Sequence, residues 1–250
     1  MNDLSEILSS IEGISLSEMD GVKLLDRVDR KYMFNIRLFP EILEALKNDY
    51  KILDVNGVRM NGYETLYFDT PEFKMYLDHH NGRLNRFKVR IRRYTESDLC
   101  FFEIKQKKNT GRTLKYRIVR ADFNDRVTDE ELKMFHRLVP EMETLIPVMQ
   151  VNYRRITLVN RKSTERLTFD LGLTFSRKDR KTFYSAIVIA EVKQNRMSDS
   201  PFVRVIHAMH IHKVSLSKYC LGIISLFDTV RKNNFYTYNR KLNKISHEEN

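Results

Sequence analysis

The stretch that decides the fold is FKVRIRRY, residues 87–94, together with its neighbour FFEIKQK, residues 101–107. In both stretches apolar and charged residues alternate with a period of two, which predicts β-strands with one apolar and one charged face. In the first strand Lys88, Arg90 and Arg92 point the same way. An ordinary half-buried strand also has polar residues on its solvent-facing side. The pattern therefore indicates a functional face only if other strands of the chain repeat it.

The chain does repeat it. Further strands with the same alternation are expected at residues 27–34, 63–69, 113–121, 152–159, 166–171 and 185–194. Short connections make most neighbouring strands antiparallel, and eight antiparallel strands can close into a barrel that holds side chains or one small ligand. One expectation is therefore an α+β fold, an eight-stranded antiparallel β-barrel with a basic lumen, covered by helices; the other is a sheet whose charged face meets solvent.

The remaining segments predict the covering helices and one domain over residues 1–250. Pro40 opens a helix, and Thr128 and Glu131 form a capping box for a second helix over residues 128–139. Within the domain we expect an N-terminal helix and connector, the barrel with inserted helices, two C-terminal helices and a frayed polar tail, at residues 1–20, 21–200, 201–232 and 233–250, respectively.

Composition limits the function. The chain has a formal net charge of +11, which favours a polyanionic partner such as phosphorylated small molecules, nucleic acid or an anionic membrane surface. Cys100 and Cys220 do not form a disulfide framework and suit a reducing compartment. No signal-peptide pattern or membrane-spanning run is present, so we expect a cytoplasmic protein whose membrane association, if any, is peripheral.

The charged strand faces carry more cations than acids, while the opposite faces are apolar and need helices to cover them. A closed lumen with this excess is costly when empty and becomes sensible if a chain of phosphates fills it. A solvated, nucleic-acid-binding face remains the alternative at this point. The cations are Arg27, Lys31, Lys88, Arg90, Arg92, Lys105, Lys107, Lys115, Arg117, Arg155, Arg166 and Lys193, and the acids are Asp29, Asp69, Glu103, Asp170 and Glu191.

A series of short motifs then occurs in order, and together they resemble the VTC domain, the catalytic domain of eukaryotic polyphosphate polymerases within the triphosphate tunnel metalloenzyme (CYTH-like) superfamily. The resemblance covers residues 27–231 and implies the eight-stranded tunnel fold. The motifs are RVDRKY (27–32), LYFDT (66–70), KVRIRRY (88–94), FEIK (102–105), KYR (115–117), YRR (153–155), RLTFD (166–170), EVK (191–193) and SK (217–218).

The resemblance implies a role for each matching residue. Contacts to the reacting phosphates are implied for Lys31, Arg90, Arg92, Lys105, Lys115, Arg155, Arg166 and Lys218. Further substrate contacts are implied for Arg83 or Arg86, Arg117, Tyr153, Lys193 and Ser217.

Glu191 is the implied ligand of a Mn²⁺ or Mg²⁺ ion, with an ion pair to Lys193 as the alternative. Glu103 and Asp170 are interpreted as structural ion-pair partners. Arg27 and Asp29 stand where the wider superfamily often has glutamates on its first strand, which weakens any transfer of a two-metal hydrolase site.

The function implied is transfer of the terminal phosphate of a nucleoside triphosphate, with ATP expected, onto a polyphosphate chain, and pyrophosphate is a further expected ligand. A triphosphatase or polyphosphate hydrolase of the same fold would pass the phosphate to water, whereas a non-catalytic polyphosphate or nucleotide sensor would need the cations alone. Nucleic acid is not expected as the main ligand. No glycine-rich phosphate loop or Ser/His/Asp order supports another enzyme class.

Overall fold

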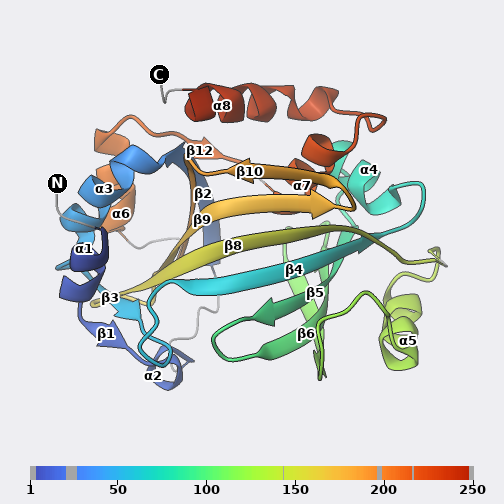
Figure 1. Ribbon diagram of the computed structural model, residues 1–250, viewed down its shortest axis with the longest axis horizontal. Helices are drawn as coiled ribbons and strands as arrows, with labels where there is room; N and C mark the ends of the chain where they lie inside the picture. The colour runs from blue at the N-terminus through green and yellow to red at the C-terminus, as the bar shows by residue number, and fades with distance from the viewer. Residues whose placement is uncertain (1–3, 21–26, 143, 196–198, 216, 248–250) are drawn as a thin grey trace.

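The computed structural model describes residues 4–20, 27–142, 144–195, 199–215 and 217–247 (Figure 1). Predicted boundaries near residues 1–3, 21–26, 196–198 and 248–250 lie outside the described residues. The strands are β1 (Gly13–Ile14), β2 (Arg27–Asn35), β3 (Tyr50–Leu53), β4 (Asn61–Asp69), β5 (Arg86–Tyr94), β6 (Leu99–Lys107), β7 (Thr113–Arg120), β8 (Ile146–Asn160), β9 (Arg166–Arg177), β10 (Arg180–Tyr184), β11 (Ile187–Asn195) and β12 (Lys213–Val214).

Eight α-helices and two short 3₁₀ helices, at Ile36–Leu38 and Asn233–Phe235, complete the described residues. The α-helices are α1 (Leu4–Ser10), α2 (Leu16–Asp20), α3 (Phe39–Leu46), α4 (Lys74–His80), α5 (Asp129–Leu138), α6 (Pro201–Ala208), α7 (Lys218–Leu226) and α8 (Tyr236–His247).

The strands form one sheet in the order β12-β2-β11-β9-β8-β4-β5-β6-β7. All neighbours on this path are antiparallel, which confirms the predicted α+β fold with its eight long strands. The short strands β1, β3, β10 and β12 were not predicted. Among the described residues the ladder ends at β12 and β7, so hydrogen bonds do not close it into a complete barrel.

The sheet nevertheless curves until its two ends face each other. Lys31 of β2 acts electrostatically on Lys88 of β5, and Lys193 of β11 acts on Lys105 of β6, although neither pair of strands is adjacent in the ladder. The charged strand faces therefore surround a common interior, and we call this side of the sheet the inner face. The alternation in the sequence correctly separated it from the outer face.

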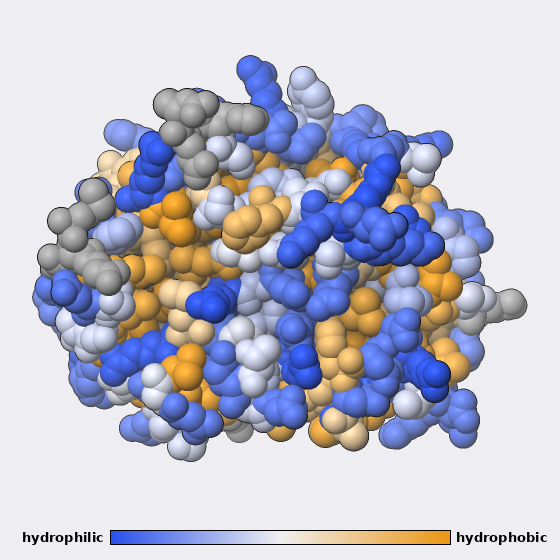
Figure 2. Space-filling model, in the orientation of Figure 1, coloured by the Kyte–Doolittle hydropathy of each residue, from blue (hydrophilic) through white to orange (hydrophobic). Residues whose placement is uncertain are grey.

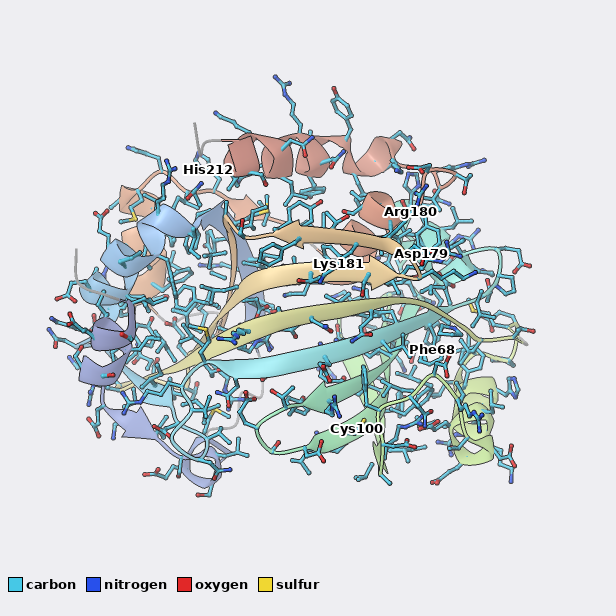
Figure 3. The ribbon with its side chains drawn as sticks, viewed as in Figure 1. Phe68, Cys100, Asp179, Arg180, Lys181 and His212 are labelled. Atoms are coloured by element: carbon cyan, nitrogen blue, oxygen red, sulfur yellow. The ribbon has the colours of Figure 1, made fainter. Side chains whose placement is uncertain are left out.

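The outer face is apolar and is covered by helices, as expected for one side of a sheet. Helices α1, α3 and α6 pack on β2, β8, β9 and β11, where Phe169 and Val188 are fully buried. Helix α5 covers the outer face of β4, β5 and β6. There Phe68 and Cys100, both labelled in Figure 3, pack with Phe135 of the helix.

One helix lies on the inner side instead. Tyr219 and Ile223 of α7 pack against Met33, Tyr67 and Val151, which project inward from β2, β4 and β8. At this end the interior is therefore filled with apolar side chains. Beyond these contacts the inner face is polar, and α7 bounds it at this end. We call the basic region enclosed by the inner face and α7 the chamber.

A β-bulge in β9 lets the sheet pack against both sets of helices. Along β8, Arg154 pairs with Leu171 and Asn152 pairs with Thr174, so β9 carries one extra residue in this interval. Gly172 lies there with a φ of +61°, which glycine adopts at little cost. Because the extra residue shifts the alternation, Phe169 packs on the outer side and Phe175 on the inner side against α7.

The C-terminal region differs from the prediction in its boundaries and its end. The first predicted helix stops at Ala208 and the second at Leu226. The segment predicted to be frayed contains α8, which lies along the upper edge in Figure 1. Its Leu242 and Ile245 are buried in the apolar cluster formed by α7 and the inner face of the sheet, which we call the α7 cluster. Figure 2 shows mainly hydrophilic side chains along this edge of the molecule. Tertiary burial therefore stabilises a helix whose composition is mostly polar.

Helix α4 was not predicted from the sequence either. Its start is fixed by Asp69, whose carboxylate accepts hydrogen bonds from the backbone of Met75 at 2.8 Å and of Tyr76 at 3.0 Å. The same carboxylate accepts a hydrogen bond from the hydroxyl group of Tyr219. Asp69 thus joins β4, α4 and α7. No helix among the described residues is long and apolar enough to cross a membrane.

Gly222 marks the closest approach of α7 to the sheet, and we predict that Gly222→Ala destabilises the protein. A Cβ atom there would lie 2.6 Å from Cδ1 of Phe175 and would also collide with Met149. Overpacking of this kind typically costs about 1–3 kcal/mol, which outweighs the preference of a helix for alanine. Denaturant unfolding measures the change.

Gly13→Ala is the control, because a Cβ atom at Gly13 would meet only Arg59 at 3.5 Å and Asp54 at 3.7 Å. Its free energy of unfolding should change by less than about 0.5 kcal/mol. Equal stability of the two variants would contradict the tight packing of α7.

Candidate functional site

The candidate site is the inner face of the sheet, where residues from eight strands and α7 surround the chamber. Strand alternation and register put the predicted site residues of β2, β5, β6, β7, β8, β9 and β11 on this face. Its charged members are Asp29, Lys31, Lys88, Arg90, Arg92, Glu103, Lys105, Lys115, Arg117, Arg155, Arg166, Asp170, Glu191 and Lys193.

Glu103 neutralises the cations of β5 and β7. Nε of Arg90 donates to its carboxylate at 2.7 Å, and Lys115 forms a second ion pair with it. Glu103 is fully buried, and burial opposes its charge, but Arg90, Arg92 and Lys115 outweigh this and lower its pKa. The predicted structural role of Glu103 agrees with this geometry, which fixes the guanidinium of Arg90 before any ligand arrives.

Asp170 plays the same part between the sheet and α7. It accepts two hydrogen bonds from Arg155, at 2.6 and 2.9 Å, and one from Lys218. Burial opposes the charge of Asp170, but Arg155 and Lys218 lower its pKa well below its ordinary value. Lys218 also lies 4.8 Å from the ring centre of Tyr153. Asp170, interpreted as structural, thus brings together three predicted site residues, Arg155, Lys218 and, through Lys218, Tyr153.

Other cations of the inner face have no carboxylate partner. Among the described residues, Lys88, Arg92 and Lys105 form no ion pair, and Arg92 donates only to the hydroxyl of Thr65, at 3.2 Å. The charge of Arg90, together with burial, lowers the pKa of Lys105 to about 5. Burial, with Lys31 and Arg90, also lowers the pKa of Lys88. The lowered pKa values show that positive charge at this place is not compensated by carboxylates, and a bound anion would favour protonation of both lysines.

Glu191 lies among cations on β11. Its nearest ion-pair partner is Lys193 at 3.6 Å, the alternative that the sequence left open. Burial opposes its charge, but Lys193, Lys31, Arg155 and Lys218 lower the pKa of Glu191 to about 2. Its side chain is 18% exposed, so the carboxylate can be reached from solvent.

The donor set around Glu191 limits the kind of metal site. Within the described residues no three His, Cys, Asp or Glu side chains come together to form a metal cage. Mg²⁺ commonly binds through one or two carboxylates while substrate phosphates and water complete its shell. Glu191 therefore fits a metal shared with a bound phosphate chain and does not fit a permanent two-metal site.

The remaining predicted residues are more dispersed. Arg83 is 62% exposed and pairs with Asp78 at 3.3 Å, whereas Arg86 begins β5 on the same face as Lys88. Arg117 is exposed on β7, and Arg166 donates to the carbonyl of Met19 in α2 at 3.2 Å.

Ser217, predicted to contact substrate, is the N-cap of α7. Its hydroxyl accepts a hydrogen bond from the backbone of Cys220 at 3.4 Å. This cap holds the first turn of the helix beside the chamber and so positions Lys218.

Sequence reasoning assigned no site role to Lys88, Tyr63, Thr65 or Tyr67. Tyr67 lies 3.4 Å from Nη1 of Arg90. Burial disfavours its phenolate, but Arg90, Arg92 and Lys88 outweigh this and lower its pKa. The alternation in residues 63–69 would have found the three β4 residues, because they share one face of that strand.

Comparison with known proteins identifies one family. A family model described as the VTC domain matches residues 26–227, most of the chain. No curated protein matches.

Among solved structures, a candidate adenylate cyclase from Bacillus halodurans is 15% identical over 77% of this chain and 94% of its own, with a TM-score of 0.49. A candidate adenylate cyclase from Vibrio parahaemolyticus is 12% identical over 80% and 99%, with a TM-score of 0.47. HpAC1 from Hippeastrum, described as having a dominant triphosphatase activity, is 13% identical over 81% and 98%, with a TM-score of 0.43. Similarity at this level does not indicate a shared function.

We predict that Asp170→Asn strongly destabilises the protein. It would leave the buried charge of Arg155 without its partner, and breaking a buried pair typically costs about 3–5 kcal/mol. Asp228→Asn is the control, because Asp228 pairs with Arg180 at the surface, where its side chain is 73% exposed, and such pairs contribute less than about 1 kcal/mol. Thermal and denaturant unfolding measure both; similar losses would contradict the role given to Asp170.

Proposed function

Because the chain belongs to the VTC domain family, we propose that it is a metal-dependent polyphosphate polymerase. It transfers the terminal phosphate of a nucleoside triphosphate, ATP in the first instance, onto polyphosphate or pyrophosphate. The observation that carries the proposal is the set of unpaired cations on the inner face, Lys88, Arg92 and Lys105. A cytoplasmic location is part of the proposal, consistent with two free, buried cysteines.

In this proposal the cations divide into two groups with different tasks. Arg92, Lys88 and Lys105 have no carboxylate partner and bind phosphate oxygens directly. Arg90 and Arg155 are already oriented by Glu103 and Asp170, so they can stabilise developing charge without reorganising. Phosphoryl transfer depends mainly on positioning and charge neutralisation, which such a set of cations provides.

Glu191 is the residue proposed to hold Mn²⁺ or Mg²⁺ together with the phosphates. A bound metal would neutralise charge on the phosphate oxygens and help to orient them. Lys193, the partner of Glu191 at 3.6 Å, can then turn to the phosphate chain. No group of three His, Cys, Asp or Glu side chains that could hold a further metal occurs among the described residues.

A triphosphatase is the second candidate, and a specific observation favours it. Strand β7 is the last strand of the sheet among the described residues, so one of its two edges has no neighbouring strand. Val119, on the inner face of β7, is 71% exposed. Water can therefore reach this side of the chamber. If water occupies the attacking position, the same cations would support hydrolysis of the triphosphate.

Incubation with ATP and Mn²⁺ tests the proposal, with long-chain polyphosphate resolved from free phosphate. Accumulation of polyphosphate supports the polymerase. Release of free phosphate alone replaces it with the triphosphatase. Binding of ATP without turnover overturns both and leaves a nucleotide or polyphosphate sensor.

We predict that Arg92→Lys lowers turnover by roughly tenfold or more, because lysine keeps the charge but loses the planar fork that grips phosphate. Arg93→Lys is the matched control: it changes the next residue of β5, which points outward and pairs with Glu64. Turnover should be unchanged in that variant. Equal activity of the two variants would remove Arg92 from the proposed site.

We predict that Glu191→Gln abolishes most metal-dependent turnover but retains binding of inorganic tripolyphosphate, because the cations remain. Glu64→Gln provides the control on the outer face of β4. Titration with Mn²⁺ in the presence of tripolyphosphate measures the change directly: the variant should show weaker metal uptake. Undiminished metal uptake would exclude Glu191 as the ligand.

A further inference from the structure

A row of aromatic side chains crosses four neighbouring strands on the inner face. Tyr153 of β8 stacks on Tyr63 of β4, with ring centres 5.1 Å apart and planes inclined by 16°. Tyr63 meets the edge of Tyr94 of β5 at 5.0 Å, and Tyr94 meets Phe101 of β6 at 6.1 Å. We call these four residues the aromatic row.

The row is buried at both ends, where Phe101 is 9% exposed, and is more accessible in its middle. Tyr153 is 4% exposed, whereas Tyr63 and Tyr94 are half-buried. Phe101 pairs in register with Val119 of β7, the most exposed large apolar residue of the described chain at 71%. An apolar surface thus continues from the row to the open edge of the sheet, on a face that is otherwise charged.

Arginines lie against the same rings. The guanidinium carbon of Arg155 lies 4.8 Å from the centre of the Tyr63 ring, and that of Arg92 lies 5.5 Å from it. Arg117 lies 4.8 Å from the centre of the Phe101 ring. Aromatic rings beside a cationic surface are the arrangement with which proteins bind a nucleobase and its phosphates together.

The order of residues along β5 gives this arrangement a direction. Lys88, Arg90, Arg92 and Tyr94 follow one another on the inner face, spaced by roughly 6.6 Å at the usual rise of a strand. Lys88 lies towards α7, since Cys220 of that helix acts on it electrostatically. Tyr94 lies at the other end, beside an exposed turn at residues 95–98. A triphosphate bound along Lys88, Arg90 and Arg92 would therefore place its nucleoside near Tyr94.

We propose that the aromatic row is a binding site for the planar base of the nucleoside triphosphate, with Tyr94 as the ring on which the base stacks. This inference rests on the proposed function, because it takes the donor to be a nucleotide and not inorganic polyphosphate. Packing accounts for Tyr153, which is buried in an apolar cluster, and in part for Tyr63, which packs against that cluster. Tyr94 belongs to none of the apolar clusters of the described residues and keeps part of its ring exposed beside the charged side chains of β5. Tyr94 thereby makes the site prefer nucleotides over bare phosphate chains.

Binding without turnover tests the proposal. Calorimetric titration of the full chain, in the presence of EDTA, compares ATP with inorganic tripolyphosphate. We expect Tyr94→Ala to weaken ATP binding by roughly five- to a hundredfold, the range found for loss of one base-stacking contact. Tripolyphosphate affinity should stay within about twofold. Tyr94→Phe keeps the ring and should bind ATP like the unchanged protein.

Tyr236→Ala is the matched control, because Tyr236 is 69% exposed at the start of α8 and belongs to no part of the site. An equal loss of ATP and tripolyphosphate affinity in Tyr94→Ala, or no loss of either, overturns the base site. If neither compound binds the unchanged protein, the proposed function itself fails. If tripolyphosphate binds as tightly as ATP, only the base site fails.

Discussion

The constraint on which this structure depends is repulsion among cations that a curved sheet collects on its inner face. Burying a charge is costly unless the charge is paired and hydrogen-bonded. Two carboxylates meet this requirement for part of the set, and each bridges two other elements of the fold. Glu103 of β6 connects Arg90 of β5 with Lys115 of β7, and Asp170 of β9 connects Arg155 of β8 with Lys218 of α7.

The position of α7 follows from the same arrangement. Its first turn carries Lys218, which reaches Asp170, and the next residue is Tyr219, which donates to Asp69. Asp69 is fully buried, and its other contacts are backbone amides at the start of α4. One end of the chamber is therefore closed by a helix whose polar contacts fix it to the strands that carry the cations.

The sequence predicted the eight long strands and their two faces because strand alternation is a local property. It failed for α4 and α8, since a polar helix is stabilised here by contacts with distant residues, such as Asp69 for α4 and the α7 cluster for Leu242 of α8. The motifs named most cations of the inner face. They did not reveal which cations are paired, because the partnership of Arg155 with Asp170 depends on the register between β8 and β9. The rings that contact Tyr63 and Tyr94, apart from each other, likewise come from two other strands, β8 and β6.

The low pKa of Lys105 has a consequence for the charge that the molecule carries. The formal net charge of +11 counts every lysine as protonated. With a pKa of about 5, Lys105 is mostly neutral in the unliganded protein at neutral pH. An arriving polyanion offsets the field of Arg90 and Arg92 and makes protonation of this amine favourable again. If a phosphate chain binds here as proposed, its binding would draw a proton from the solvent, and Lys105 would be charged only in the ligand-bound state.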